Sequence, residues 1–115
     1  MKIAIVTGAS SGMGREFVRQ IEHLYKELDE IWVIARRRER LEELQSRMLT
    51  NVRILQGDLL DDDIYEILEK LLEEKKPNVR MLVNAAGFVP FGADDEQAAG
   101  LLHFFRLLGD GCFIL

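Results

Sequence analysis

Thr7-Gly8-Ala9-Ser10-Ser11-Gly12-Met13-Gly14 is the stretch of sequence that decides the fold. It follows an apolar run at residues 3–6 and precedes a segment with helical periodicity, so it joins a strand to a helix. Gly8 lets the chain turn sharply off the strand, Gly12 lets backbone N–H groups approach a phosphate, and Gly14 lets the helix pack closely. A glycine-rich turn between a strand and a helix predicts a cradle for a pyrophosphate. A plain turn rich in small residues is the alternative.

Composition places the chain among ordinary globular domains. Its 115 residues are 48% hydrophobic and carry a formal net charge of −5, which fits one domain over residues 1–115. The acidic balance argues against nucleic acid as a partner, and no apolar run approaches the length of a membrane span. We find no secretory signal, and the single Cys112 forms no internal disulfide. We therefore expect a cytoplasmic protein.

The periodicity along the chain alternates between strand and helix. Strands are expected at residues 3–6, 31–34, 52–55 and 79–83, with helices at 12–28, around 41–48, and from the Asp61-Asp62-Asp63 cap to Pro77. The first helix should bury Phe17, Ile21, Leu24 and Leu28, and the third Ile64, Ile67, Leu68, Leu71 and Leu72. This pattern predicts an α/β fold, a Rossmann-like parallel sheet of order 3-2-1-4 in a truncated three-layer α/β/α sandwich. A short fifth strand, residues 112–115, is a further possibility.

A cluster of arginines follows the second predicted strand. Arg36, Arg37, Arg38 and Arg40 oppose the dipole of the helix that they begin, so an anion is expected to compensate them. In dinucleotide-binding folds the adenosine ribose lies about 20 residues beyond the glycine turn, and Ala35 is 21 positions after Gly14. A site for NAD(H) would place an acidic residue there. Arginine forks instead match a 2′-phosphate, which favours NADP(H). A solvated helix start is the alternative.

The TGxxxGxG pattern of residues 7–14 resembles the short-chain dehydrogenase/reductase family, and three later motifs strengthen the resemblance. Ala35-Arg36-Arg37 looks like the family's NADP-preferring members, Asp58-Leu59 like its adenine-binding element, and Asn84-Ala85-Ala86-Gly87 like its NNAG element. The resemblance implies that Asp58 and the following backbone group hold the adenine amino group, and that Asn84 ties the central strand to its neighbour. Asp58 is equally explained as a turn or cap residue. The predicted cofactor-binding residues are Gly8, Ser10, Ser11, Gly12, Met13, Gly14, Arg36, Arg37, Asp58, Leu59, Asn84, Ala85, Ala86 and Gly87.

The resemblance covers roughly residues 1–91 and includes none of the family's catalytic residues. The family uses a serine and a Tyr-x-x-x-Lys pair, whereas here Tyr25 is followed by Asp29 and Tyr65 by Glu69. We therefore expect the NADP(H)-binding portion of an oxidoreductase that interconverts alcohols and carbonyls, inactive alone, with a small-molecule substrate bound only in a full-length parent. The gap between the fourth strand and the segment at residues 111–115 is short for the family, which a deletion, a frameshift or a deliberate truncation would each explain.

Two alternatives to an oxidoreductase portion remain open, a non-enzymatic nucleotide-binding or assembly module and an unstable fragment. The segment after residue 91 predicts a helix with an apolar face, including Leu101, Leu102 and Phe105, and then the apolar end Phe113-Ile114-Leu115. Since an unpaired apolar sheet edge invites pairing with another chain, we expect a homo-oligomer through the C-terminal third.

Overall fold

The computed structural model describes residues 1–10, 12–59, 61–85 and 113–114. Strands and helices alternate along the chain, as the periodicity predicted. The elements are β1 (Lys2–Thr7), α1 (Gly12–Leu24), β2 (Glu30–Ala35), α2 (Arg38–Ser46), β3 (Asn51–Gln56), α3 (Asp62–Lys75), β4 (Asn78–Asn84) and β5 (Phe113–Ile114).

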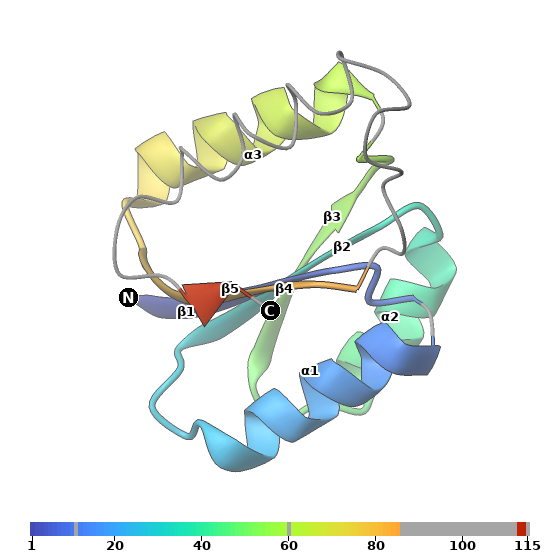
Figure 1. Cartoon of the computed structure of the whole chain (residues 1–115), viewed down its shortest axis with the longest axis vertical. Helices are drawn as coiled ribbons and strands as arrows, with labels where there is room; N and C mark the ends of the chain where they lie inside the picture. The colour runs from blue at the N-terminus through green and yellow to red at the C-terminus, as the bar shows by residue number, and fades with distance from the viewer. Residues whose placement is uncertain (11, 60, 86–112, 115) are drawn as a thin grey trace.

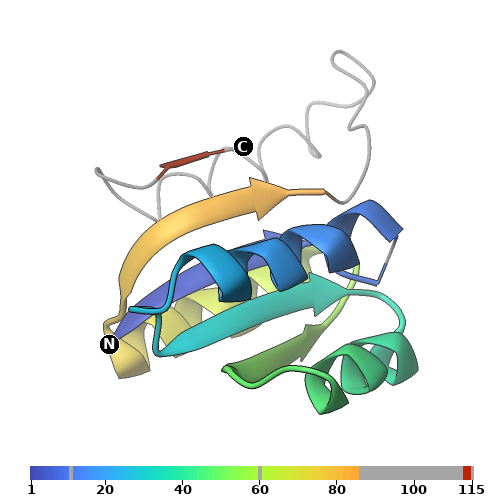
Figure 2. The same ribbon diagram turned by 90° about the horizontal axis from the view of Figure 1, so that it is seen from below.

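The strands form one parallel sheet of order β3-β2-β1-β4-β5. This confirms the predicted order 3-2-1-4 and the short fifth strand, in which Phe113 and Ile114 pair with Met81 and Leu82. The long strands run in the same direction (Figure 2), so their carboxyl ends meet at one edge of the sheet. All loops that carry predicted site residues leave the sheet at this edge.

Helices cover both faces of the sheet and make the predicted three layers (Figure 1). α1 and α2 lie on one face and α3 lies on the other. Strand side chains alternate between the two faces: Val6 and Val33 pack with α1 and α2, whereas Ile5 and Trp32 pack with α3. The central strands are buried on both faces, which is why β1 and β2 read as continuous apolar runs.

Some predicted helix boundaries and buried positions are wrong. α1 ends at Leu24, four residues early; Leu24 is 64% exposed, whereas Leu28 is buried from the following loop. Ile67 on α3 was predicted to be buried and is half exposed. In both cases the residue has a helical spacing from its neighbours but points beyond the edge of the face that the sheet covers.

The ends of α3 follow the sequence signals only in part. Asp62 and Asp63 occupy its first turn, as expected for a helix N-terminus, but Asp61 at the N-cap makes no side-chain capping hydrogen bond. The helix closes on Lys76, which adopts a left-handed conformation with φ 45° and donates its backbone N–H to the Leu72 carbonyl. Pro77 follows at once and prevents continuation, as predicted.

Several sequence-based predictions lie outside the described residues. These are Ser11, Ala86 and Gly87 of the predicted cofactor site and the helix expected between residues 94 and 108. Oligomerisation through the C-terminal third also stays a prediction. Within the described part of the chain, no helix is long and apolar enough to span a membrane.

Candidate cofactor site at the carboxyl ends of the strands

Backbone hydrogen bonds hold the strand-end loops in register at one edge of the sheet. Gly8 N–H donates to the Ile34 carbonyl at 2.8 Å, and Gly57 N–H donates to the Ala35 carbonyl at 2.9 Å. These bonds join the glycine turn to the end of β2, and the end of β2 to the end of β3. β1 has β2 on one side and β4 on the other, so the direction of winding reverses here. In open α/β sheets, ligands bind at such a switch point.

The glycine turn has the conformation that its sequence predicted. Gly8 adopts φ 69°, a left-handed conformation that glycine enters without strain. A Cβ on Gly14 would collide with the carbonyl of Gly8 and lie 2.9 Å from the Cα of Ala9, so glycine lets α1 pack directly on the turn. A Cβ on Gly12 would meet nothing within 4 Å. The surface at Gly12 is therefore open to a ligand, as a phosphate cradle requires.

The electrostatics of the α1 N-terminus suit an anion. The first turn of α1 carries no acidic side chain, and Met13 in it is 69% exposed. The N-terminus of α3, in contrast, carries Asp62 and Asp63. Since a helix N-terminus bears partial positive charge, its own carboxylates compensate α3, and α1 is left able to receive an external anion.

Two predicted arginines lie exposed at the end of β2. Arg36 follows the buried Ala35, and Arg37 is the N-cap of α2. Neither guanidinium forms an ion pair with a described residue. Arg38 differs, because its Nε donates to Glu42 Oε1 at 3.0 Å, one helical turn on. The exposed pair Arg36 and Arg37 thus remains available for a phosphate.

Asp58 and Leu59 follow β3, and Asp58 lies near Arg36. A hollow of about 440 Å³ is lined by Arg36, Asp58, Ile64 and other residues of these loops. Gln56 Nε2 donates to the Arg36 carbonyl at 3.3 Å, a further link between the ends of β2 and β3. The structure thus brings together a cation and a carboxylate that are 22 positions apart in the sequence.

Asn84 joins β4 to β1, as predicted from the resemblance. The Thr7 hydroxyl, which is 1% exposed, donates to Asn84 Oδ1 at 2.7 Å. Ala85 N–H donates to the Thr7 carbonyl at 3.1 Å. These contacts hold the end of β4 against the end of β1, so the side chain of Asn84 serves the sheet.

Comparisons with known proteins agree with this geometry. The family model of short chain dehydrogenases matches residues 2–102. The chain belongs to the short chain dehydrogenase family. A curated relative, the dehydrogenase/reductase SDR family protein 7-like of Dictyostelium discoideum, is 30% identical over 95% of this chain and 33% of that protein. The chain therefore spans about a third of the length of the curated relatives that it matches.

Solved structures of short chain dehydrogenases share the fold. The KRED1-Pglu enzyme superposes with a TM-score of 0.76 and 20% identity, covering 100% of this chain and 56% of that one. The L-sorbose reductase of Gluconobacter frateurii, solved with NADPH and L-sorbose, gives a TM-score of 0.67 and 25% identity over 93% of this chain and 46% of that one. Short chain dehydrogenases are oxidoreductases that bind nicotinamide dinucleotides.

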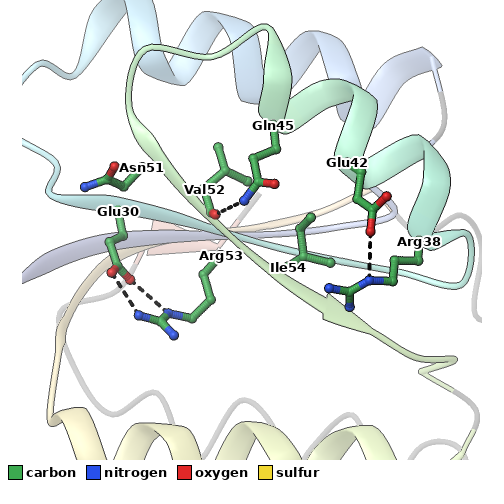
Figure 3. Close-up of a pocket in the computed structure, with 8 residues that line it drawn as sticks. All are labelled: Glu30, Arg38, Glu42, Gln45, Asn51, Val52, Arg53 and Ile54. Atoms are coloured by element: carbon green, nitrogen blue, oxygen red, sulfur yellow. Dashed lines mark hydrogen bonds and ion pairs between the residues drawn. The ribbon is translucent and has the colours of Figure 1, made fainter.

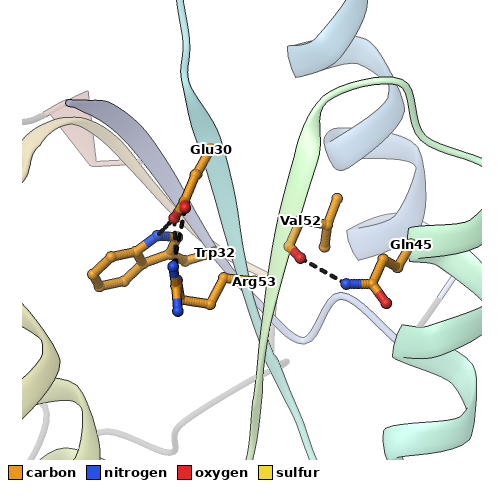
Figure 4. Close-up of polar contacts among 5 residues, drawn as sticks. All are labelled: Glu30, Trp32, Gln45, Val52 and Arg53. Carbon is orange, nitrogen blue, oxygen red and sulfur yellow. Dashed lines mark hydrogen bonds and ion pairs between the residues drawn. The ribbon is translucent and has the colours of Figure 1, made fainter.

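A second polar cluster, at the opposite end of β2 and β3, was not foreseen from the sequence. Arg53 donates to both carboxylate oxygens of Glu30, at 3.0 and 3.1 Å, and Trp32 Nε1 donates to Glu30 Oε2 at 2.8 Å (Figure 4). The Arg53 bond lowers the pKa of Glu30, and the same bond raises the pKa of Arg53. Trp32 pairs with Arg53 in the sheet register, so period-two alternation with correct strand pairing could have revealed the cluster.

The outer edge of β3 is hollowed but internally satisfied. A hollow of about 630 Å³ there is lined by Glu30, Arg53, Arg38, Glu42 and four neighbours (Figure 3). Its charges pair with one another, and Gln45 Nε2 donates to the Val52 carbonyl at 2.8 Å. The charged groups that line this hollow therefore already have partners within it.

Proposed function

We propose that this chain binds NADPH in preference to NADH at the carboxyl ends of its strands, as the cofactor-binding portion of an oxidoreductase that interconverts alcohols and carbonyls. The observation that supports this most is the exposed pair Arg36 and Arg37, which lies at the end of β2 and makes no ion pair with a described residue. NADPH carries a 2′-phosphate that NADH lacks, and guanidinium forks bind phosphate in a bidentate way. NADPH is also present in the L-sorbose reductase complex.

Each part of the proposed site has one task. The turn from Gly8 to Gly14 and the N-terminus of α1 receive the pyrophosphate, because the backbone is open at Gly12 and the helix dipole favours an anion. Arg36 and Arg37 hold the 2′-phosphate, and Asp58 accepts a hydrogen bond from the adenine amino group. The loop from Asn84 to Ala85 bounds the crevice from the β4 side. The nicotinamide supplies the hydride when the cofactor is bound.

Calorimetric titration of NADPH and NADH tests the cofactor preference. We expect NADPH to bind more tightly, and Arg36→Ala to remove most of the difference, because a charge-assisted hydrogen bond contributes about 1.5–3 kcal/mol. Arg19→Ala is the matched control, since Arg19 is an exposed arginine of α1 that pairs with Glu16. Equal affinities for the two cofactors in the unchanged chain would contradict the assignment.

We further propose that the 115 residues alone bind the cofactor without reducing a carbonyl substrate. Tyr65 contributes no tyrosine–lysine pair, because it is buried on α3 with Glu69 four places on. Positioned acid–base groups commonly supply 10²–10⁴-fold in rate, so their absence should leave only a background reaction. NADPH absorbance followed with a panel of ketones and aldehydes tests this. Oxidation that is proportional to protein and survives repurification would refute it.

A further inference from the structure

Tyr65 makes a contact that neither the motifs nor the proposed function uses. It lies in the first turns of α3, is 8% exposed, and donates its hydroxyl to the backbone carbonyl of Leu59 at 2.5 Å. Burial raises the pKa of this hydroxyl, as do the carboxylates of Asp58 and Asp62, so it stays a donor well above neutral pH. A side chain of α3, Tyr65, is therefore hydrogen-bonded to the loop after β3.

The peptide groups on both sides of Leu59 are held. Asp61 N–H donates to the Asp58 carbonyl at 2.9 Å, which fixes the peptide between Asp58 and Leu59. Tyr65 fixes the peptide after Leu59. Because a peptide plane is rigid, two fixed planes leave Leu59 little freedom in φ or ψ.

This arrangement decides where the Leu59 N–H points. A trans peptide directs its C=O and N–H to opposite sides, and the described chain contains no cis peptide. The Asp58 carbonyl points into the turn toward Asp61, so the Leu59 N–H points out of it. No described residue accepts a hydrogen bond from this N–H. It is a preoriented donor next to the Asp58 carboxylate.

Close packing of the helix on the loop supports the same role. A Cβ on Gly57 would lie 2.7 Å from the side chain of Ile64, so the glycine lets α3 approach the end of β3 directly. Ile64 is 2% exposed and belongs to the core on the α3 face. The neighbouring Tyr65 is thereby placed at hydrogen-bonding distance from the Leu59 carbonyl.

We propose that Tyr65 is a positioning residue for adenine recognition, holding Asp58 and the Leu59 N–H in the arrangement that reads the edge of the base. This rests on the proposed binding of an adenine dinucleotide. Adenine presents an amino donor beside a ring-nitrogen acceptor, which a carboxylate and an adjacent N–H match. Hypoxanthine presents a carbonyl in place of the amino group and loses that match. Tyr65 thus acts on the choice of base without touching the cofactor.

Titration of NADPH and of its hypoxanthine analogue against the full chain and Tyr65→Phe tests the proposal. Phenylalanine keeps the buried ring and removes the donor. We expect the unchanged chain to prefer NADPH about tenfold, and Tyr65→Phe to weaken NADPH about fivefold while leaving the analogue within about twofold, the effect of one hydrogen bond. A general loosening of the fold would instead weaken both ligands equally. Tyr25→Phe, at an exposed tyrosine after α1, is the control.

A second variant removes the other constraint on Leu59. Asp61→Pro deletes the N–H that holds the Asp58 carbonyl, at the residue before the first turn of α3, where no intrahelical hydrogen bond is lost. We expect the same selective loss of NADPH affinity. Equal losses for both ligands, or an unchanged preference in either folded variant, would overturn the role of Tyr65. If the unchanged chain bound NADPH with Arg36-dependent affinity but showed no preference over the analogue, the proposed function would stand and this inference would fall.

Discussion

The two ends of the parallel sheet treat their charged side chains differently. At the amino ends of β2 and β3, Arg53 forms two hydrogen bonds to Glu30, and Trp32 supplies a third donor to the same carboxylate. At the carboxyl ends, Arg36 and Arg37 form no ion pair with a described residue. The described chain thus pairs Arg53 with a shielded carboxylate at one end of the sheet and leaves Arg36 and Arg37 exposed at the other.

We interpret this contrast as a difference between charged side chains that stabilise the fold and charged side chains that are proposed to bind a ligand. Glu30 is shielded, with 17% of its side chain exposed, and its charge would be costly without Arg53. Arg36 is exposed to solvent, so its charge needs no protein partner and its guanidinium is accessible to a phosphate. Arg36 and Arg37, which form no ion pair with a described residue, together with an α1 first turn that lacks acidic side chains, support the proposal of an anion site at these strand ends.

The largest expected effect separates two glycines of the same turn. Gly14→Ala places a Cβ against backbone atoms of Gly8 and Ala9 that cannot move easily, so we expect a loss of about 3 kcal/mol or more in unfolding free energy. Gly12→Ala adds a Cβ in open space and should stay within about 0.5 kcal/mol while lowering NADPH affinity. Urea unfolding and calorimetry measure both quantities. Equal stability losses would show that Gly12 is also structural.

A smaller effect is expected at the amino end. Arg53→Met removes the guanidinium that bonds to Glu30. We expect a loss of about 1.5 kcal/mol in unfolding free energy, the low end for a hydrogen bond to a charged group, because the Arg53 side chain is 34% exposed. Arg38→Met breaks the ion pair with Glu42, in which both side chains are more than half exposed, and should lower the unfolding free energy by about 0.3–0.5 kcal/mol. NADPH affinity should not change in Arg53→Met. A marked loss of NADPH affinity in Arg53→Met would contradict the assignment of different roles to the two ends of the sheet.

The Glu30 contribution has a defined pH dependence. Its pKa is lowered in the folded state, mainly by the bond from Arg53, so it stabilises the fold fully above its unfolded-state pKa. The stabilisation is lost as the pH falls through the lower folded pKa. The stability gap between the unchanged chain and Arg53→Met should therefore close between pH 5 and the acid limit. A gap that stays constant over this range would contradict the role of Glu30.

A further effect, smaller than that of Arg53→Met, concerns the buried hydroxyl that joins β1 to β4. Thr7→Val keeps the shape and removes the donor to Asn84, so we expect a loss of about 1 kcal/mol in unfolding free energy. Thr50→Val, at a partly exposed loop position, is the matched control. Indistinguishable melting temperatures for the two variants would mean that Thr7 contributes nothing through its hydroxyl.

The buried strands and the glycine positions could be predicted from the sequence because each depends on a few neighbouring residues. The apolar run at residues 31–34 predicts a strand buried on both faces, and β2 is one. Gly8 and Gly14 stand where a positive φ and a close backbone approach demand glycine. The ends of helices were harder to predict. Periodicity identifies the buried positions Ile21 and Leu28, but it does not show whether the chain between them stays helical.

The contacts that sequence reasoning missed depend on strand register or on how a helix packs against its neighbouring loop. Trp32 and Arg53 are neighbours only because β2 and β3 pair in one particular alignment. Tyr65 meets the Leu59 carbonyl only because α3 turns back over the loop that precedes it. The predicted site residues, in contrast, lie at strand ends, where a parallel sheet gathers them whatever the details of packing.

Amide chemical-shift mapping of the labelled chain with NADPH tests the central claim most directly. We expect the amides of Gly8, Gly12, Arg36 and Leu59 to shift on titration, while those of Glu30, Arg53 and Asn78 at the opposite end of the sheet stay in place. Saturable shifts confined to the carboxyl-end loops would support a cofactor site there. Shifts centred on the outer edge of β3 or on the amino ends, or no saturable shift at all, would contradict it.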